Sequence, residues 1–90
     1  MARTKRSTPA ELTPGWPAEP SPDPAAEVAR KFALALEAGR GERSLRLIAR
    51  DAGISHTILL KVLAGATWPD LATLARIERS VGVRLWPDLD

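Results

Sequence analysis

The sequence predicts an all-α fold, a compact bundle of four to five helices, and three observations support this. Apolar residues recur at helical spacing through most of the chain after residue 23, and no segment alternates with a period of two. Residues that can cap a helix start, Asp or Ser, precede these segments, and glycines follow most of them. A chain of 90 residues has room for one domain with a small core.

Residues 1–22 differ in composition from the rest of the chain. They hold five of the eight prolines and no sustained apolar period, so we expect a disordered, Pro-rich, basic tail. Its first basic residues, Arg3, Lys5 and Arg6, suit an arm that reaches a DNA groove or an ordinary solubilising terminus. Trp16 is expected to be exposed or to anchor an unseen partner. The folded domain is then predicted to span residues 23–90.

Two helices are predicted in the first half of this domain. Asp23 caps the first helix, Pro24 suits its first position, and Gly39 and Gly41 end it. Its apolar face comprises Val28, Ala29, Phe32, Ala35 and Leu36. Ser44 caps a second, short helix that Gly53 interrupts, with an apolar face made of Leu45, Ile48, Ala49 and Ala52.

Two further helices are predicted in the second half. Ser55 caps the third helix and Gly65 closes it, with Leu59, Val62 and Leu63 facing inward. Asp70 caps the fourth helix and Gly82 ends it, and its repeating apolar face includes Leu71, Leu74, Ala75, Ile77 and Val81. Leu85 and Trp86 then fold back on the core. Trp68 and Trp86 are expected to shield this thin core, with a homodimer surface as the alternative for Trp86.

Residues 45–64 meet the requirements of two short helices joined at a steep angle. The first helix needs a small residue at the crossing, which Ala49 supplies, and the turn needs positive φ, which suits Gly53. The positions that point into the angle are all apolar: Ile48, Ala52, Ile54, Leu59 and Val62. The pattern predicts a helix-turn-helix.

The segment from Ser44 to Gly65, SLRLIARDAGISHTILLKVLAG, resembles the helix-turn-helix of the phage repressor and Cro-like (XRE-type) family. The later segment WPDLATLARIERSVGVRL, from Trp68 to Leu85, is similar to the loop and helix that follow in that family. The resemblance covers roughly Val28 to Trp86. It implies a lambda-repressor-like bundle and a sequence-specific, double-stranded DNA-binding transcriptional regulator, most simply a repressor.

The resemblance implies that the third helix lies in the major groove, with the preceding helix on the phosphate backbone. The implied base-contacting residues are His56, Thr57, Ile58, Leu60 and Lys61. Phosphate contacts are implied for Arg43, Ser44, Arg46, Arg50 and Thr67, around the positive start of the second helix and in the loop after the third. Between Arg40 and Lys61, five basic residues stand against two acidic ones.

Two positions depart from the family pattern. Leu45 stands where relatives often have glutamine, so one polar contact to an operator is missing. Ile58 and Leu60 place apolar groups on the face that should meet DNA, where they suit thymine methyl groups or a protein partner. An antitoxin-like or adaptor module, which holds another protein through Ile58 and Leu60 or through the tail, is therefore the second hypothesis.

Composition disfavours an enzyme. The chain has no cysteine, which rules out a cysteine-based metal site, and its one histidine has no second histidine with which to share a metal, so no cofactor is expected. No apolar run reaches the length of a membrane span. We expect a cytoplasmic, nucleoid-associated protein whose partners are double-stranded DNA and, for a two-fold operator, a second copy.

Overall fold

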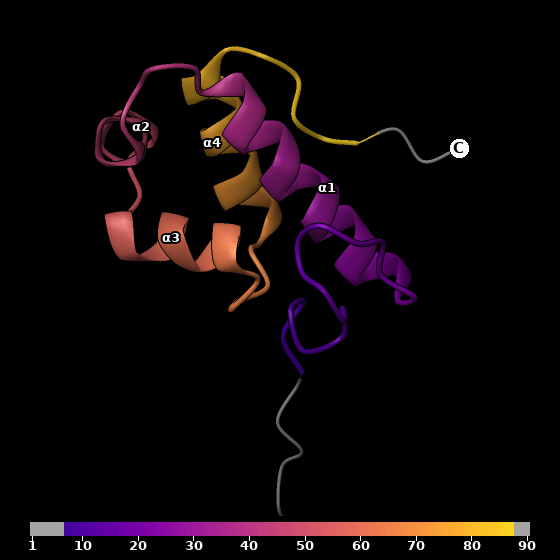
Figure 1. Cartoon of the computed structure of the whole chain (residues 1–90). Coiled ribbons are helices and arrows are strands. Elements are labelled where there is room, and N and C mark those ends of the chain that lie inside the picture. Colours follow the sequence, from indigo (N-terminus) through magenta and orange to yellow (C-terminus); the bar gives the residue numbers. More distant parts are fainter. Residues whose placement is uncertain (1–6, 88–90) are drawn as a thin grey trace, which may run out of the picture.

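A computed structural model describes residues 7–87 of the chain, and within them four helices and no strand are present (Figure 1). The helices are α1 (Pro24–Gly39), α2 (Leu45–Ala52), α3 (His56–Ala64) and α4 (Leu71–Val81). In Figure 1, α2 and α3 lie to one side of the pair formed by α1 and α4. The prediction of an all-helical bundle is confirmed for this part of the chain.

Each helix begins at the capping residue that the sequence predicted. A side-chain oxygen of Asp23, Ser44, Ser55 and Asp70 accepts a hydrogen bond from the backbone N–H three residues later. This bond satisfies one of the donors that the first helical turn leaves unpaired. The last three helices end at glycines with left-handed φ angles of 74°, 68° and 82°. Helix boundaries here are local properties of the sequence.

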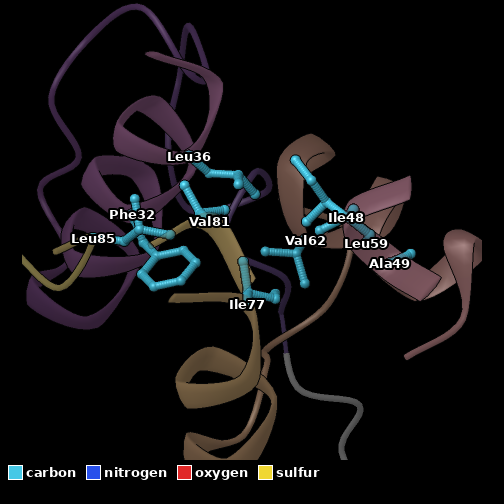
Figure 2. Packing of buried hydrophobic residues seen from close by; sticks show 9 residues of the cluster. All are labelled: Phe32, Leu36, Ile48, Ala49, Leu59, Val62, Ile77, Val81 and Leu85. Atoms are coloured by element: carbon cyan, nitrogen blue, oxygen red, sulfur yellow. The ribbon is translucent and has the colours of Figure 1, made fainter. Parts of the chain in front are cut away.

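The core lies where the four helices meet, as Figure 2 shows. It consists of Phe32, Leu36, Ile48, Ala49, Leu59, Val62, Ile77, Val81 and Leu85, all buried. Leu85 reaches the core from beyond α4 because the backbone N–H groups of Leu85 and Trp86 both donate to Oε2 of Glu78, at 2.7 and 3.0 Å. The two donors, Trp86 first, also hold the pKa of Glu78 below its ordinary value.

Leu71 does not belong to the core, contrary to prediction. It is the first residue of α4, and its side chain is 73% exposed. The apolar repeat of the helix reaches back to this position, but the described residues leave most of the Leu71 side chain open to solvent. Leu74, one turn later, is half-buried and packs against the core as expected.

Residues 7–22 form successive turns that pack on the end of α3, so the prediction of a disordered tail is wrong for this range. The backbone N–H of Ala10 donates to the Gly65 carbonyl at 2.9 Å, and the indole N–H of Trp16 donates to the Leu63 carbonyl at 3.1 Å. Pro9 and Thr13 are buried. The prolines prevent helices and strands in this range, but they do not prevent it from packing on the domain. The indole of Trp16 supplies the apolar surface that packs against the end of α3. The basic residues Arg3, Lys5 and Arg6 lie outside the described residues.

The same segment is hydrogen-bonded to an ion pair that lies within α1. Glu27 accepts two hydrogen bonds from the Arg30 guanidinium, at 2.7 and 2.8 Å, and one from the backbone N–H of Ser21 at 2.7 Å. Arg30 also donates to the Pro17 carbonyl at 3.1 Å. The Arg30 guanidinium, followed by the Ser21 N–H, lowers the pKa of Glu27 to about 2 from an ordinary value of 4.5.

This lowered pKa predicts an acid-sensitive contribution to stability. A carboxylate whose folded pKa is depressed stabilises the fold above pH 4.5, and that stabilisation is lost as the pH falls toward 2. Melting temperatures measured from pH 7 to pH 2 should therefore fall less steeply for Glu27→Gln than for the unaltered chain. Glu37→Gln, which removes the exposed partner of Arg40, controls for the loss of one negative charge from α1. Parallel profiles for Glu27→Gln and the unaltered chain would contradict the assignment.

Candidate nucleic-acid interface

Three residues, Gly53, Ile54 and Ser55, connect α2 to α3. Gly53 has φ 74°, and its N–H donates to the Arg50 carbonyl at 3.2 Å, while the Ile54 N–H reaches back to the Ala49 carbonyl at 3.0 Å. These two bonds end α2 and reverse the direction of the backbone. The next residue, Ser55, is already the N-cap of α3. A Cβ on Gly53 would meet no atom within 4 Å, so the left-handed backbone, not crowding, favours glycine here.

The residues predicted to hold the two helices together lie on their inward faces. Ile48, Ala49, Leu59 and Val62 are buried, and Ile54 is half-buried against the same core. Figure 2 shows Ile48, Ala49 and Leu59 together, apart from the Phe32 and Leu85 end of the cluster. Since these side chains fix one face of α3, the opposite face is left to solvent.

The outward face of α3 carries the residues expected to contact bases. Thr57 and Lys61 are exposed, Ile58 and Leu60 are 39% and 44% exposed, and His56 is half-buried at the helix start. Thr57 and Lys61 are four residues apart and therefore neighbours on the helix surface, and Ile58 is one turn before Lys61. Lys61 thus stands beside both a hydroxyl group and an apolar group on one exposed surface.

Three exposed cationic side chains of α2 and α3 take no part in an ion pair among the described residues. Within residues 7–87 the ion pairs join Glu27 to Arg30 and Glu37 to Arg40. Arg46 and Arg50 on α2 and Lys61 on α3 are exposed and belong to neither pair. Their charges are therefore available to an anion in solution. Thr67, the weaker phosphate candidate, is half-buried in the loop after α3.

Arg43 is a correction to the predicted phosphate contacts, because its guanidinium is used inside the fold. It donates to the carbonyls of Ser80 and Val81 at 3.1 and 2.8 Å, at the end of α4. It also donates to the carbonyls of Gly39 and Arg40 at 3.3 and 3.2 Å, at the end of α1. Four carbonyls left free by two helix ends thus take its N–H groups. No pattern in the sequence indicates that the ends of α1 and α4 meet beside residue 43.

Ser44 is exposed and has a structural task as well. Its Oγ accepts the Leu47 N–H at 3.0 Å as the cap of α2. A hydroxyl oxygen that accepts one bond still has a proton to donate, so a contact to a phosphate oxygen is compatible with the cap. The start of α2 accordingly offers the Ser44 hydroxyl and, two residues later, the charge of Arg46.

Other exposed groups near α2 were not assigned a contact by the sequence. Leu47 is 43% exposed on the outward side of α2. Arg76 and Arg79 of α4 are exposed and line a shallow hollow with Asp51 near the end of α2. Asp51 in turn accepts a hydrogen bond from the Ser80 hydroxyl at 2.9 Å. Arg76 and Arg79 are three residues apart, which predicts that they share one face of α4. Only the fold shows that this face adjoins α2.

The tryptophans occupy different environments. Trp68 is half-buried and its indole N–H donates to the Ser7 carbonyl at 2.6 Å. Trp86 is 39% exposed, so it only partly shields the core. Between them lies an apolar pocket against α1, which the sequence did not predict because its walls come from segments far apart in the chain.

Among residues 7–87, no cluster of three or more His, Cys, Asp or Glu side chains is placed to hold a metal ion. No helix in the same range combines the length and the apolar character needed to cross a membrane.

Comparisons of the chain with protein-family models, with curated proteins and with solved structures gave no significant match. The assignment of a function therefore rests on the residues and on their arrangement.

Proposed function

We propose that this chain is a sequence-specific, double-stranded DNA-binding transcriptional regulator, a repressor of the Cro-like helix-turn-helix type. The observation that carries the proposal is the exposed face of α3, where Thr57 and Lys61 are neighbours, together with the exposed, unpaired charges of Arg46 and Arg50 on the adjoining helix α2. A short helix with one face fixed to the core and the other free suits the major groove of B-DNA in width. In this role the protein acts in the cytoplasm at the nucleoid.

Each group has a task in this proposal. Lys61 donates to O6 or N7 of guanine, and Thr57 offers its hydroxyl to a base edge or its methyl group to thymine. Ile58 and Leu60 pack on thymine methyl groups, and His56 donates to guanine or to a phosphate. Arg46, Arg50, Ser44 and Thr67 position the chain on the phosphate backbone without choosing a sequence. On a two-fold operator, two copies occupy half-sites about one helical turn apart.

The test is selection from a random duplex library with the purified chain at moderate salt. We expect a defined motif to be enriched, and we expect the double variant Thr57→Ala/Lys61→Ala to lose it. Lys31→Ala removes an exposed lysine of α1, outside the proposed interface, and should keep the motif. Retention of the same motif by the double variant would show that α3 does not read it.

The phosphate contacts are tested on the same duplex. Arg46→Gln should weaken binding to every sequence alike and should reduce the slope of log affinity against log salt by about one. Arg84→Gln, which removes an exposed arginine beyond α4, is the matched control and should leave the slope unchanged. An equal reduction of the slope by both variants would show that only net charge matters.

The exposed apolar side chains favour one alternative, a module that binds another protein. Ile58, Leu60 and Leu47 are each about two-fifths exposed and belong to adjacent helices. For this function, Ile58→Ser/Leu60→Ser should abolish binding of the partner while Thr57→Ala/Lys61→Ala preserves it. Weak, uniform and salt-sensitive binding in the library selection, with no motif, would favour this alternative.

A further inference from the structure

An apolar pocket opens between the first half of α1 and the segment that joins α3 to α4. It has a volume of about 400 Å³, within the range of small-molecule sites. Its walls come from α1, α3 and α4 and from the segments that follow α3 and α4. They include Val28 and Phe32 of α1, Val62 of α3, Trp68 of the following loop, Leu71 at the start of α4, and Trp86 beyond α4. Phe32 and Val62 are themselves buried, so they form a closed floor on the side of the core. Figure 2 shows these two side chains with Ile77 between them in this view.

The lining of the pocket determines the chemistry of its occupant. Among residues 7–87, Asp70 is the only charged side chain that lines it, and its carboxylate already accepts the Thr73 N–H at 2.7 Å as the cap of α4. The indole N–H of Trp68 is bonded to the Ser7 carbonyl. An ion entering this pocket would lose its hydration without a compensating partner, and an anion would also face the Asp70 charge. Two indoles and a phenyl ring instead favour flat, apolar rings.

We propose that this pocket binds a small, uncharged aromatic molecule. The pocket leaves Leu71 and Trp86 in contact with water, at 73% and 39% exposure, and an occupant that covers them removes apolar surface from solvent. The concave shape and the closed floor suit a molecule of one to three rings better than the flat face of a second protein. The lack of an available charge excludes nucleotides and other phosphorylated ligands.

The site is separate from the surface proposed to bind DNA, and the proposal holds whether or not α3 reads a sequence. The two surfaces are nevertheless adjacent through one helix. Val62, in the floor of the pocket, is the residue after Lys61, which faces solvent on α3. A molecule seated in the pocket therefore contacts the inward side of the helix whose outward side carries Thr57 and Lys61.

The test uses a neutral fluorescent probe, N-phenyl-1-naphthylamine, titrated against the full chain. We expect saturable binding of one probe per chain by fluorescence and by calorimetry. The matched anion, 8-anilinonaphthalene-1-sulfonate, has the same rings with one added charge and should bind at least about tenfold more weakly, which corresponds to about 1.4 kcal/mol. Equal or tighter binding of the sulfonate would overturn the proposal of an uncharged ligand.

The location of the probe is tested with a matched pair of substitutions on α1. Ala25 is exposed at the mouth of the pocket, whereas Ala38 is exposed near the other end of the helix and is not part of it. Ala25→Phe should weaken probe binding by at least about tenfold, and Ala38→Phe should leave it unchanged. Leu71→Gln, at a position with little packing to lose, gives a second variant that should also weaken binding. Equal affinities for all these variants would overturn the assignment of the site.

Sedimentation at increasing protein concentration separates a ligand from a second copy of the chain. Probe affinity should be independent of chain concentration for a small-molecule site. If the chain dimerises, the dimer excludes the probe, and Ala25→Phe abolishes dimer formation, then a second copy occupies the pocket and the proposal is wrong.

Discussion

Replacing Gly65 by alanine is expected to lower the free energy of unfolding by about 3 kcal/mol. The residue has φ 68°, which costs an L-amino acid about 1–2 kcal/mol. The added Cβ would also lie 2.6 Å from Cε2 of Trp16 and 2.9 Å from Cβ of Ala10. The turns of residues 7–22 would have to move away from the end of α3, and urea unfolding followed by circular dichroism measures the loss.

Gly53→Ala is the matched control for this prediction. Gly53 has a similar φ of 74°, but a Cβ there meets no atom within 4 Å. It should cost only about 1 kcal/mol, the price of the backbone conformation alone. In addition, the combined variant Trp16→Ala/Gly65→Ala should be less destabilised than the sum of its two single variants, because the clash with the indole is gone and only the close approach to Ala10 remains. Equal costs for Gly65→Ala and Gly53→Ala would show that Trp16 does not pack on residue 65.

Replacing Arg43 by methionine is expected to lower the free energy of unfolding by about 2–3 kcal/mol, because the guanidinium donates to four carbonyls at the ends of two helices. Methionine keeps the apolar stem and removes every donor. Arg43→Lys should recover only part of the loss, since one ammonium group cannot reach both helix ends as a planar guanidinium does. Chemical unfolding of the three chains under one buffer condition gives the comparison.

Arg46→Met provides the control for charge and size. Arg46 is exposed and makes no ion pair with another described residue, so this substitution should change stability by less than about 0.5 kcal/mol. Its effect should instead fall on DNA affinity. If Arg43→Met proved as stable as Arg46→Met and weakened DNA binding more, Arg43 would be a phosphate contact and the structural assignment would be wrong.

The helix limits were predictable because they depend on neighbours in sequence. Asp23, Ser44, Ser55 and Asp70 each bond to an N–H only three residues away, so the sequence contains both partners of the bond. The split of α3 into an inward face and an outward face was predictable for the same reason, since helical periodicity alone places Leu59 opposite Lys61.

The features that the sequence did not predict all depend on contacts between distant segments. The Arg43 guanidinium meets carbonyls 37 and 38 residues further along the chain. Trp16 meets a carbonyl 47 residues away, and the pocket between Trp68 and Trp86 needs α1 as its wall. The wrong prediction for Leu71 has the same origin. The apolar repeat of α4 predicted that its side chain is buried, but burial needs a distant segment that covers it, and the side chain is largely exposed.

The packing of residues 7–22 on the end of α3 also bears on the order in which the chain folds. The partners of Trp16 and Ser7 lie 47 and 61 residues later, so these contacts close large loops, whereas each helix closes bonds over four residues. We therefore expect residues 7–22 to dock on the end of α3 only after the helices have formed.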